Sequence, residues 1–145
     1  MKEKIFEAFA ELGFKLEQRD DIGYGFSYEG TNFIFIPNED DEDFLNICVP
    51  GVYDLEEDSP FIFIELMNKI NSTLKYVKAY ELSKRISLFY ERELFGDEDL
   101  MKVISRMILH LEAALVFSHT AVAEMRSSEE TNGEDNDVVE SDDKE

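Results

Sequence analysis

Histidine and cysteine, which often act as bases, nucleophiles and zinc ligands, are rare in this chain. The two histidines, His110 and His119, lie nine residues apart in a segment predicted to be helical. At about 100° per residue, that spacing puts them on opposite sides of a helix, so they cannot share a metal ion or a proton. Cys48, the single cysteine, lies in a predicted strand with no histidine near it in sequence. We interpret the histidines as surface or helix-end residues and Cys48 as a buried thiol.

Acidic side chains offer two further candidates for chemistry. The loop from Asn38 to Asp43 is dense in oxygen ligands, but a calcium loop needs ligands at fixed intervals and a glycine at its turn, and this loop has no such glycine. We expect a solvated turn that keeps a sheet edge from pairing, and cation binding stays open. Glu91 and Glu93 share one face of a predicted strand, yet the residues opposite them are unknown, so a catalytic carboxylate pair is not predicted.

No phosphate-binding or nucleophile motif is present: the sequence lacks GxxxxGK[ST], GxSxG, HExxH and a GxGxxG that follows a strand. Gly23-Tyr24-Gly25 lies within a strand pattern and predicts a bulge or bend. We therefore predict no catalytic, cofactor-binding or metal-binding residue. A small enzyme of unknown reaction is the least favoured hypothesis, because only the numerous carboxylates support it.

The chain is strongly acidic. Its 145 residues include 34 Asp or Glu and 14 Lys or Arg, for a formal net charge of -20. The segment from Ser127 to Glu145 carries -8 of this charge and residues 1–126 carry -12. Such a charge repels nucleic-acid phosphate and anionic lipid, so we expect no direct contact with nucleic acid or a membrane surface.

The last residues differ in composition from the rest. Val138 and Val139 are their only sizeable apolar side chains, too few to offset the entropy of ordering. We predict a single α+β domain over 1–126 and a disordered acidic tail over 127–145. The tail is either a solubilising appendage or an interaction arm for a basic partner.

Localisation signals are weak. Glu7 and Glu11 interrupt any signal-peptide core, and nowhere do 18 apolar residues run together. With a single cysteine, these features favour a reducing cytoplasm.

The hydrophobic pattern predicts strands and helices in separate blocks. Gly13 ends the first helix, Pro50-Gly51 closes the fourth strand, and Ser59-Pro60 provides an N-cap hydroxyl and a first helical proline. We expect an α+β fold with a mostly antiparallel sheet. Its order is a helix (3–12), three or four strands (among 14–17, 24–28, 33–36 and 45–49), a helix (60–73), two strands (76–82 and 86–94) and a long C-terminal helix capped by Asp97.

The long helix is apolar on two faces in its second half. Leu109, Ala113, Val116 and Phe117 lie away from the main apolar stripe. They are either buried within the same chain or form a partner or dimer surface.

This order of elements resembles the type III secretion chaperone-like superfamily, including YbjN-type proteins described as proposed sensory transduction regulators. The resemblance covers residues 1–126 and is carried by Ile5 to Phe9 leading into Gly13-Phe14, the aromatic strand Tyr24 to Tyr28, Ser59-Pro60 and the helix from Asp97. It implies a non-enzymatic, usually dimeric, acidic cytoplasmic protein that holds a client's peptide segment or regulates by contact. The acidic tail departs from this pattern.

The preferred hypothesis is a protein-binding module, chaperone-like or regulatory and a homodimer, that engages a protein segment through apolar sheet or helix surface and needs no cofactor. The alternative is an acidic decoy that occupies the basic nucleic-acid-binding surfaces of other proteins. The two differ in the salt dependence of binding.

Overall fold

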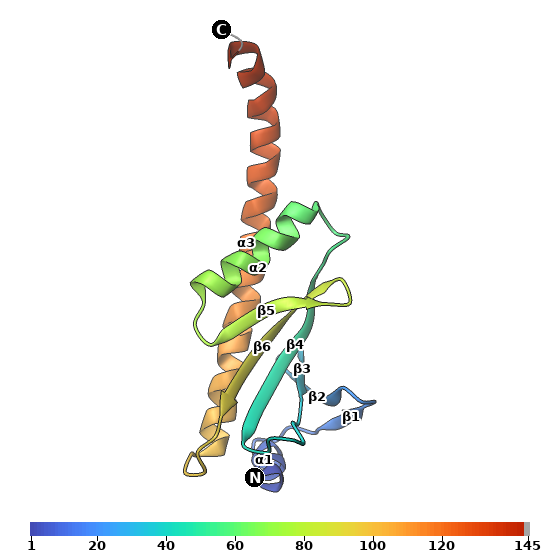
Figure 1. Cartoon of the computed structure of the whole chain (residues 1–145), viewed down its shortest axis with the longest axis vertical. Helices are drawn as coiled ribbons and strands as arrows, with labels where there is room; N and C mark the ends of the chain where they lie inside the picture. Colours follow the sequence, from blue (N-terminus) through green and yellow to red (C-terminus); the bar gives the residue numbers. More distant parts are fainter. Residues whose placement is uncertain (144–145) are drawn as a thin grey trace.

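The computed structural model describes residues 1–143, with side chains as far as Glu129. Within this range the chain has the predicted α+β fold, with one six-stranded antiparallel sheet in the order β1-β2-β3-β4-β6-β5 and three helices (Figure 1). In chain order the elements are α1 (Lys2–Glu11), β1 (Glu17–Arg19), β2 (Gly23–Tyr28), β3 (Thr31–Phe35), β4 (Phe44–Asp54), α2 (Pro60–Thr73), β5 (Val77–Leu82), β6 (Arg85–Glu93) and α3 (Leu100–Asp143).

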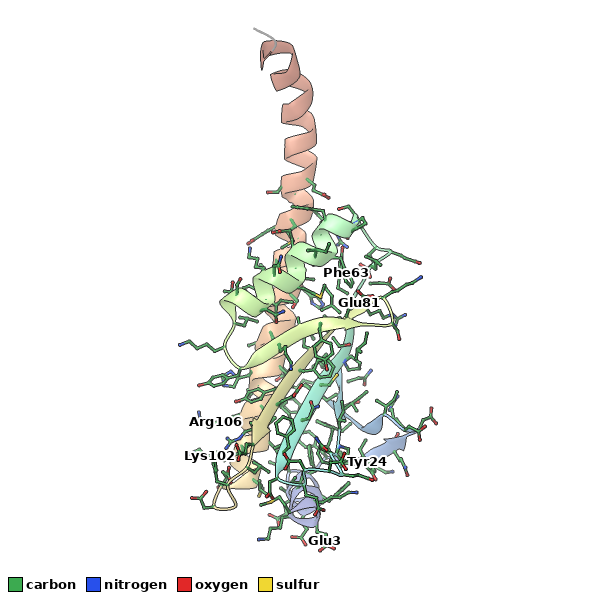
Figure 2. The ribbon with its side chains drawn as sticks, viewed as in Figure 1. Glu3, Tyr24, Phe63, Glu81, Lys102 and Arg106 are labelled. Atoms are coloured by element: carbon green, nitrogen blue, oxygen red, sulfur yellow. The ribbon has the colours of Figure 1, made fainter. Side chains whose placement is uncertain are left out.

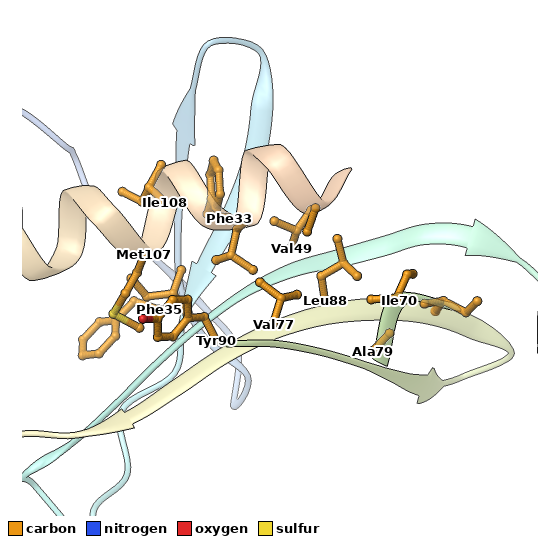
Figure 3. Close-up of a cluster of buried hydrophobic side chains, with 14 of the residues drawn as sticks. Phe33, Phe35, Val49, Ile70, Val77, Ala79, Leu88, Tyr90, Met107 and Ile108 are labelled. Carbon is orange, nitrogen blue, oxygen red and sulfur yellow. The ribbon is translucent and has the colours of Figure 1, made fainter. Parts of the chain in front are cut away.

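One face of the sheet carries the hydrophobic core. Successive side chains of a strand point to opposite faces, and those on this face form one buried cluster with side chains of all three helices. Figure 3 shows part of it, with Met107 and Ile108 of α3 among Phe33, Phe35 and Val49 of the sheet. Full burial of one large apolar side chain is worth about 1.5–3 kcal/mol, so these contacts fix the helices to this face.

The first helix is confirmed, and aromatic contacts attach it to the sheet. The ring centroid of Phe9 lies 5.2 Å from that of Phe26 and 5.1 Å from that of Phe35. Gly13 follows the helix with a φ of +88°, a conformation that side chains with a Cβ rarely adopt. The glycine stop therefore works as predicted.

The strand predicted over 14–17 is displaced along the chain. Strand β1 begins at Glu17, which pairs with Gly25 of β2. Phe14 lies before the strand and packs its ring 5.0 Å from Phe26. Phe14 is apolar because the segment that connects α1 to β1 packs against the core. An alternating pattern of apolar residues does not distinguish such a segment from a strand.

The prediction that Pro50-Gly51 closes the fourth strand is wrong, because β4 continues to Asp54. The register with β6 shifts between Val49 and Tyr53, which marks a bulge. Gly51 has a φ of +61°, and its N–H donates to Ser87 Oγ at 3.1 Å. The Ser87 hydroxyl thus accepts a hydrogen bond from the Gly51 N–H at the point where the regular backbone pairing of β4 and β6 is interrupted.

The starts of the last two helices differ in detail from prediction. Ser59 is the N-cap of α2, but its hydroxyl makes no capping bond and instead donates to Glu129 Oε1 at 3.0 Å. At the start of α3, Asp99 rather than Asp97 accepts the N–H of Lys102, at 3.3 Å. Both helices nevertheless begin within a few residues of the expected position.

Helix α3 extends past the rest of the fold (Figure 1) and is helical as far as Asp143. The disordered acidic tail expected over 127–145 stays a prediction, and residues 144–145 of it lie outside the described residues. A domain boundary at 126 stays a prediction.

Side-chain contacts with the rest of the fold continue up to this boundary and, through Ser59 and Glu129, past it. Arg126 Nη2 donates to Asp58 Oδ2 at 2.6 Å and to Glu57 Oε2 at 3.2 Å. The turn before α2 is thereby joined to α3 close to the predicted end of the domain.

Candidate binding surfaces

The second face of the sheet carries a groove. All three helices pack into the core cluster on the opposite face, and in Figure 1 the β1–β2 and β5–β6 hairpins both project away from α3. Between them lies a hollow with a volume of about 530 Å³. This volume falls within the range typical of ligand pockets.

The groove has an apolar floor, and its rim carries apolar side chains beside Ser83 and Arg85. Ile34, Cys48 and Phe89 are neighbours across β3, β4 and β6, and Phe89 is only 2% exposed because the ring of Tyr80 stacks on it at 4.2 Å. On the rim, Ile22 is 58% exposed and Leu82 is 48% exposed. An apolar side chain from another molecule would therefore contact the rim first.

Cys48 is buried in strand β4, as predicted. Burial raises the pKa of its thiol to about 12. Because the thiolate is the nucleophile, Cys48 has no basis for reactivity in the folded chain and acts as part of the apolar floor.

One edge of the sheet is capped by a side chain at a single residue. Strand β5 is an edge strand, and at Ala79 its N–H donates to Asn71 Oδ1 at 2.7 Å while Asn71 Nδ2 donates to the Ala79 carbonyl at 2.9 Å. The carboxamide, carried by α2, thus takes the place of a neighbouring strand. At the opposite edge, β1 has three exposed residues, Glu17–Arg19, and no strand beyond it within residues 1–143.

The apolar residues predicted to form a partner or dimer surface lie along α3. Leu109, Ala113 and Val116 are exposed, Val116 to 65%, whereas Phe117 is half-buried and packs against the core cluster. Leu109 also lines a small hollow of about 230 Å³ beside Phe14 of the α1–β1 connection. Three of the four residues are therefore available to a partner, and Phe117 is partly used within the chain.

The acidic candidates are held in local contacts. In the loop from Asn38 to Asp43, Asn38 Oδ1 accepts the N–H of Asp40 at 3.2 Å and Asp41 Oδ1 accepts that of Asp43 at 3.3 Å. Among the described residues, no group of three His, Cys, Asp or Glu side chains is placed to hold a metal ion.

The two strand carboxylates do not face other carboxylates across the sheet. Glu91 is opposite Asn46 and Glu93 is opposite Phe44. Glu91 forms an ion pair with Lys78, at 3.2 Å. Their register partners therefore supply no second acid group.

Both histidines are exposed, as predicted. His110 lies against two tyrosine rings, with its ring centroid 5.2 Å from that of Tyr76 and 5.9 Å from that of Tyr90. In residues 1–143, no helix is long and apolar enough to cross a membrane.

Comparisons with known proteins identify the fold. No protein-family model matches the chain, and no curated protein matches it. An uncharacterised protein from Methanothermobacter thermautotrophicus is similar in structure, with a TM-score of 0.62 and 16% identity over 86% of this chain and 97% of that chain. YbjN from E. coli, described as a proposed transcription regulator, is also similar, with a TM-score of 0.52 and 9% identity over 88% of this chain and 92% of that chain.

These likenesses place the chain among α+β proteins with a YbjN-like fold. At such low identity they show the fold alone and assign no role to a residue. The resemblance predicted from the sequence is thus confirmed at the level of the fold. The rim residues Ile22 and Leu82 were not predicted as a site, because one lies in a turn and the other at a strand end, and only the sheet brings them to one groove.

Proposed function

We propose that this protein is a non-enzymatic binding module, chaperone-like or regulatory, that takes an apolar segment of a partner protein into the groove between its two hairpins. The groove with its exposed rim is the observation that carries the proposal. Exposed apolar surface around a hollow is typical of protein interaction sites. One of the two structural neighbours is described as a proposed regulator and the other as uncharacterised, which is compatible with such a role.

The edges of the sheet favour one direction of approach. The Asn71 side chain forms hydrogen bonds with the N–H and the carbonyl of Ala79 in β5. By contrast, β1 has no neighbouring strand on its outer side among the described residues. A segment that adds to β1 forms main-chain hydrogen bonds there, and where it continues beyond the strand it can bring an apolar side chain to Ile22 on the groove rim. Backbone pairing then supplies affinity and the groove supplies selectivity.

A homodimer forms part of the proposal. Leu109, Ala113 and Val116 present exposed apolar surface on α3, with Phe117 behind them. Light scattering is expected to show a species near twice 16.8 kDa, and Val116→Asp is expected to halve that mass because it places a charge in an apolar contact. A monomer at all micromolar concentrations would contradict the dimer.

The groove is tested by capture from cytoplasmic extract with the full chain and three variants. Ile22→Asp and Leu82→Asp put a carboxylate on the rim, and loss of an apolar anchor typically weakens binding by about 2 kcal/mol or more. Phe61→Asp is the matched control, because Phe61 is also largely exposed but lies on α2. We expect the same partner proteins to be lost with both rim variants and kept with the control.

Salt separates this function from the acidic decoy. Binding through an apolar groove persists at high salt. Capture of basic proteins by an acidic surface depends on charge attraction, which is lost at 1 M ionic strength because the Debye length falls to about 3 Å. If every captured protein is released by salt and none depends on Ile22 or Leu82, the groove proposal fails and the decoy is favoured.

A further inference from the structure

A second pocket lies on the helical side of the sheet, at the amino-terminal part of α3. Its volume is about 340 Å³. Two tyrosines and four nitrogen-bearing side chains surround it: Tyr76 before β5, Tyr90 and Arg92 of β6, and Lys102, Arg106 and His110 of α3. Figure 2 shows Lys102 and Arg106 near the lower end of α3, beside the end of β6. Three successive parts of the chain, the segment before β5, strand β6 and helix α3, therefore meet here.

The pocket is cationic in a strongly acidic protein. Acidic residues outnumber basic ones by 34 to 14 in the chain, yet no carboxylate is among the described residues that line this pocket. Lys102, Arg106 and His110 follow one another at four-residue spacing, which puts them on one face of α3. The amino-terminal end of the helix adds positive potential at the same place.

Two of these cations have no carboxylate partner in the described part of the chain. Arg92 pairs with Glu98, with Nη2 and Oε2 2.8 Å apart, and its Nε donates to the Glu93 carbonyl. Neither Lys102 nor Arg106 forms an ion pair with residues 1–129. Counting Glu98 against Arg92 leaves two positive charges unbalanced, which matches the charge of about -2 on a phosphate monoester.

The wall beside these cations is aromatic. The rings of Tyr76 and Tyr90 stack with centroids 5.6 Å apart and planes at 7°, and Tyr76 is 64% exposed. Its outer surface can receive another flat ring by stacking.

Tyr76 is held in this position by strained backbone. Its φ is +69°, and the N–H of Val77 donates to the Lys75 carbonyl at 2.8 Å, which makes Tyr76 the centre of a γ-turn of the rare, strained type. A bulky residue with positive φ is unusual, and burial does not account for it because the ring is mostly exposed. Such strain is concentrated at binding sites.

We propose that this pocket binds a small molecule in which a flat ring carries a phosphate group. Lys102 and Arg106 donate to the phosphate oxygens, and Arg92, held in place by Glu98, lies beside them. The ring of the ligand stacks on Tyr76. This site lies across the sheet from the groove and is independent of the proposed partner binding.

The test is a titration of the full chain with phenyl phosphate, inorganic phosphate and benzyl alcohol, with amide chemical shifts as the readout. The salt concentration is 0.15 M, at which the Debye length is about 8 Å and the charges of distant carboxylates are screened. Phenyl phosphate is expected to shift the amides around Tyr76 and Lys102 and to bind at least tenfold more tightly than either fragment probe. Equal affinity for phenyl phosphate and benzyl alcohol, or no shift with phenyl phosphate, would overturn the proposal.

Two variants and a control assign the roles. Arg106→Gln is expected to weaken phenyl phosphate binding by about tenfold or more, because it removes a hydrogen bond to a charged group. Lys15→Gln makes the same change of charge at an exposed position in the α1–β1 connection and is expected to leave binding unchanged. Equal losses in the two variants would mean that only overall charge matters, and the site would be rejected.

The Tyr76→Gly variant tests the role of the tyrosine ring in ligand binding without disturbing the fold. Glycine adopts a positive φ without strain, so the variant is expected to remain folded and to keep its affinity for inorganic phosphate. Phenyl phosphate is then expected to bind no more tightly than inorganic phosphate. If the preference for phenyl phosphate survives in this variant, the aromatic wall is not the binding surface and the proposal is wrong.

Discussion

Replacing Asn71 by alanine tests how one side chain caps the edge of the sheet at a single residue. Asn71 makes two hydrogen bonds to the backbone of Ala79, one as acceptor at 2.7 Å and one as donor at 2.9 Å. Both atoms of Ala79 lie at the outer edge of β5, where no strand pairs with them in the described structure. In the variant these groups can bond only to water or to another chain.

The expected loss follows from these two bonds. At about 0.5–1.5 kcal/mol each, they contribute about 1–3 kcal/mol to the free energy of unfolding. Asn71 lies in α2, and alanine has a higher helix propensity than asparagine by about 0.6 kcal/mol. The net destabilisation is therefore about 0.5–2.5 kcal/mol, which lowers Tm by roughly 2–10 °C in a domain of this size.

Asn68→Ala is the matched control. Asn68 lies on the same helix, is exposed, and makes no side-chain hydrogen bond with another described residue. Its replacement changes helix propensity by the same amount and is expected to stabilise the fold slightly. Urea unfolding followed by circular dichroism gives both free energies, and their difference isolates the two bonds to Ala79. If the two variants have equal stability, the edge is not capped by Asn71 in the way we infer.

Three further predictions concern single contacts. Asp58 accepts hydrogen bonds from Arg126 and Tyr53, which hold the pKa of its carboxyl below the ordinary value. Its contribution to stability is therefore present above the ordinary pKa and is lost as the pH falls through the lowered pKa. The urea midpoints of the wild type and Asp58→Asn should converge in acid, and a constant gap would contradict this. Ser87→Ala leaves the Gly51 amide without its acceptor and should cost about 1–3 kcal/mol in urea unfolding; an unchanged midpoint would show that water replaces the hydroxyl. Burial raises the pKa of the Cys48 thiol to about 12, so the thiol should react with iodoacetamide only as fast as the chain unfolds. Labelling of the native chain at the rate of a free thiol would refute this burial.

Most of the fold could be predicted because local patterns and tertiary packing agree. Gly13 ends α1 and Pro60 begins α2 where expected, since a positive φ and a missing N–H have fixed consequences for the backbone. Pro50-Gly51 has the same composition as a turn, yet β4 continues through it. What decides the outcome there is Ser87 on the neighbouring strand, and a one-dimensional pattern does not contain that contact.

The candidate sites could be predicted less well for a related reason. The surface of Leu109, Ala113 and Val116 belongs to one helix, so its periodicity is visible in the sequence. These three side chains are exposed, and their use by a partner stays a prediction. The groove and the cationic pocket each draw residues from several elements. The only feature of the pocket that can be recognised within one segment of the sequence is the four-residue spacing from Lys102 to His110. By itself this spacing is typical of any solvated helix face.

The distribution of charge now gives the two sites different selectivity. A net charge of -20 repels anions at long range, so an anion that occupies the pocket must be held by short contacts with Lys102 and Arg106. The same field attracts basic protein segments toward the molecule, although the groove itself is apolar. Affinity for a phosphate should therefore depend mainly on those two side chains, whereas the acidic surface should change how fast a basic partner associates more than how long it stays bound.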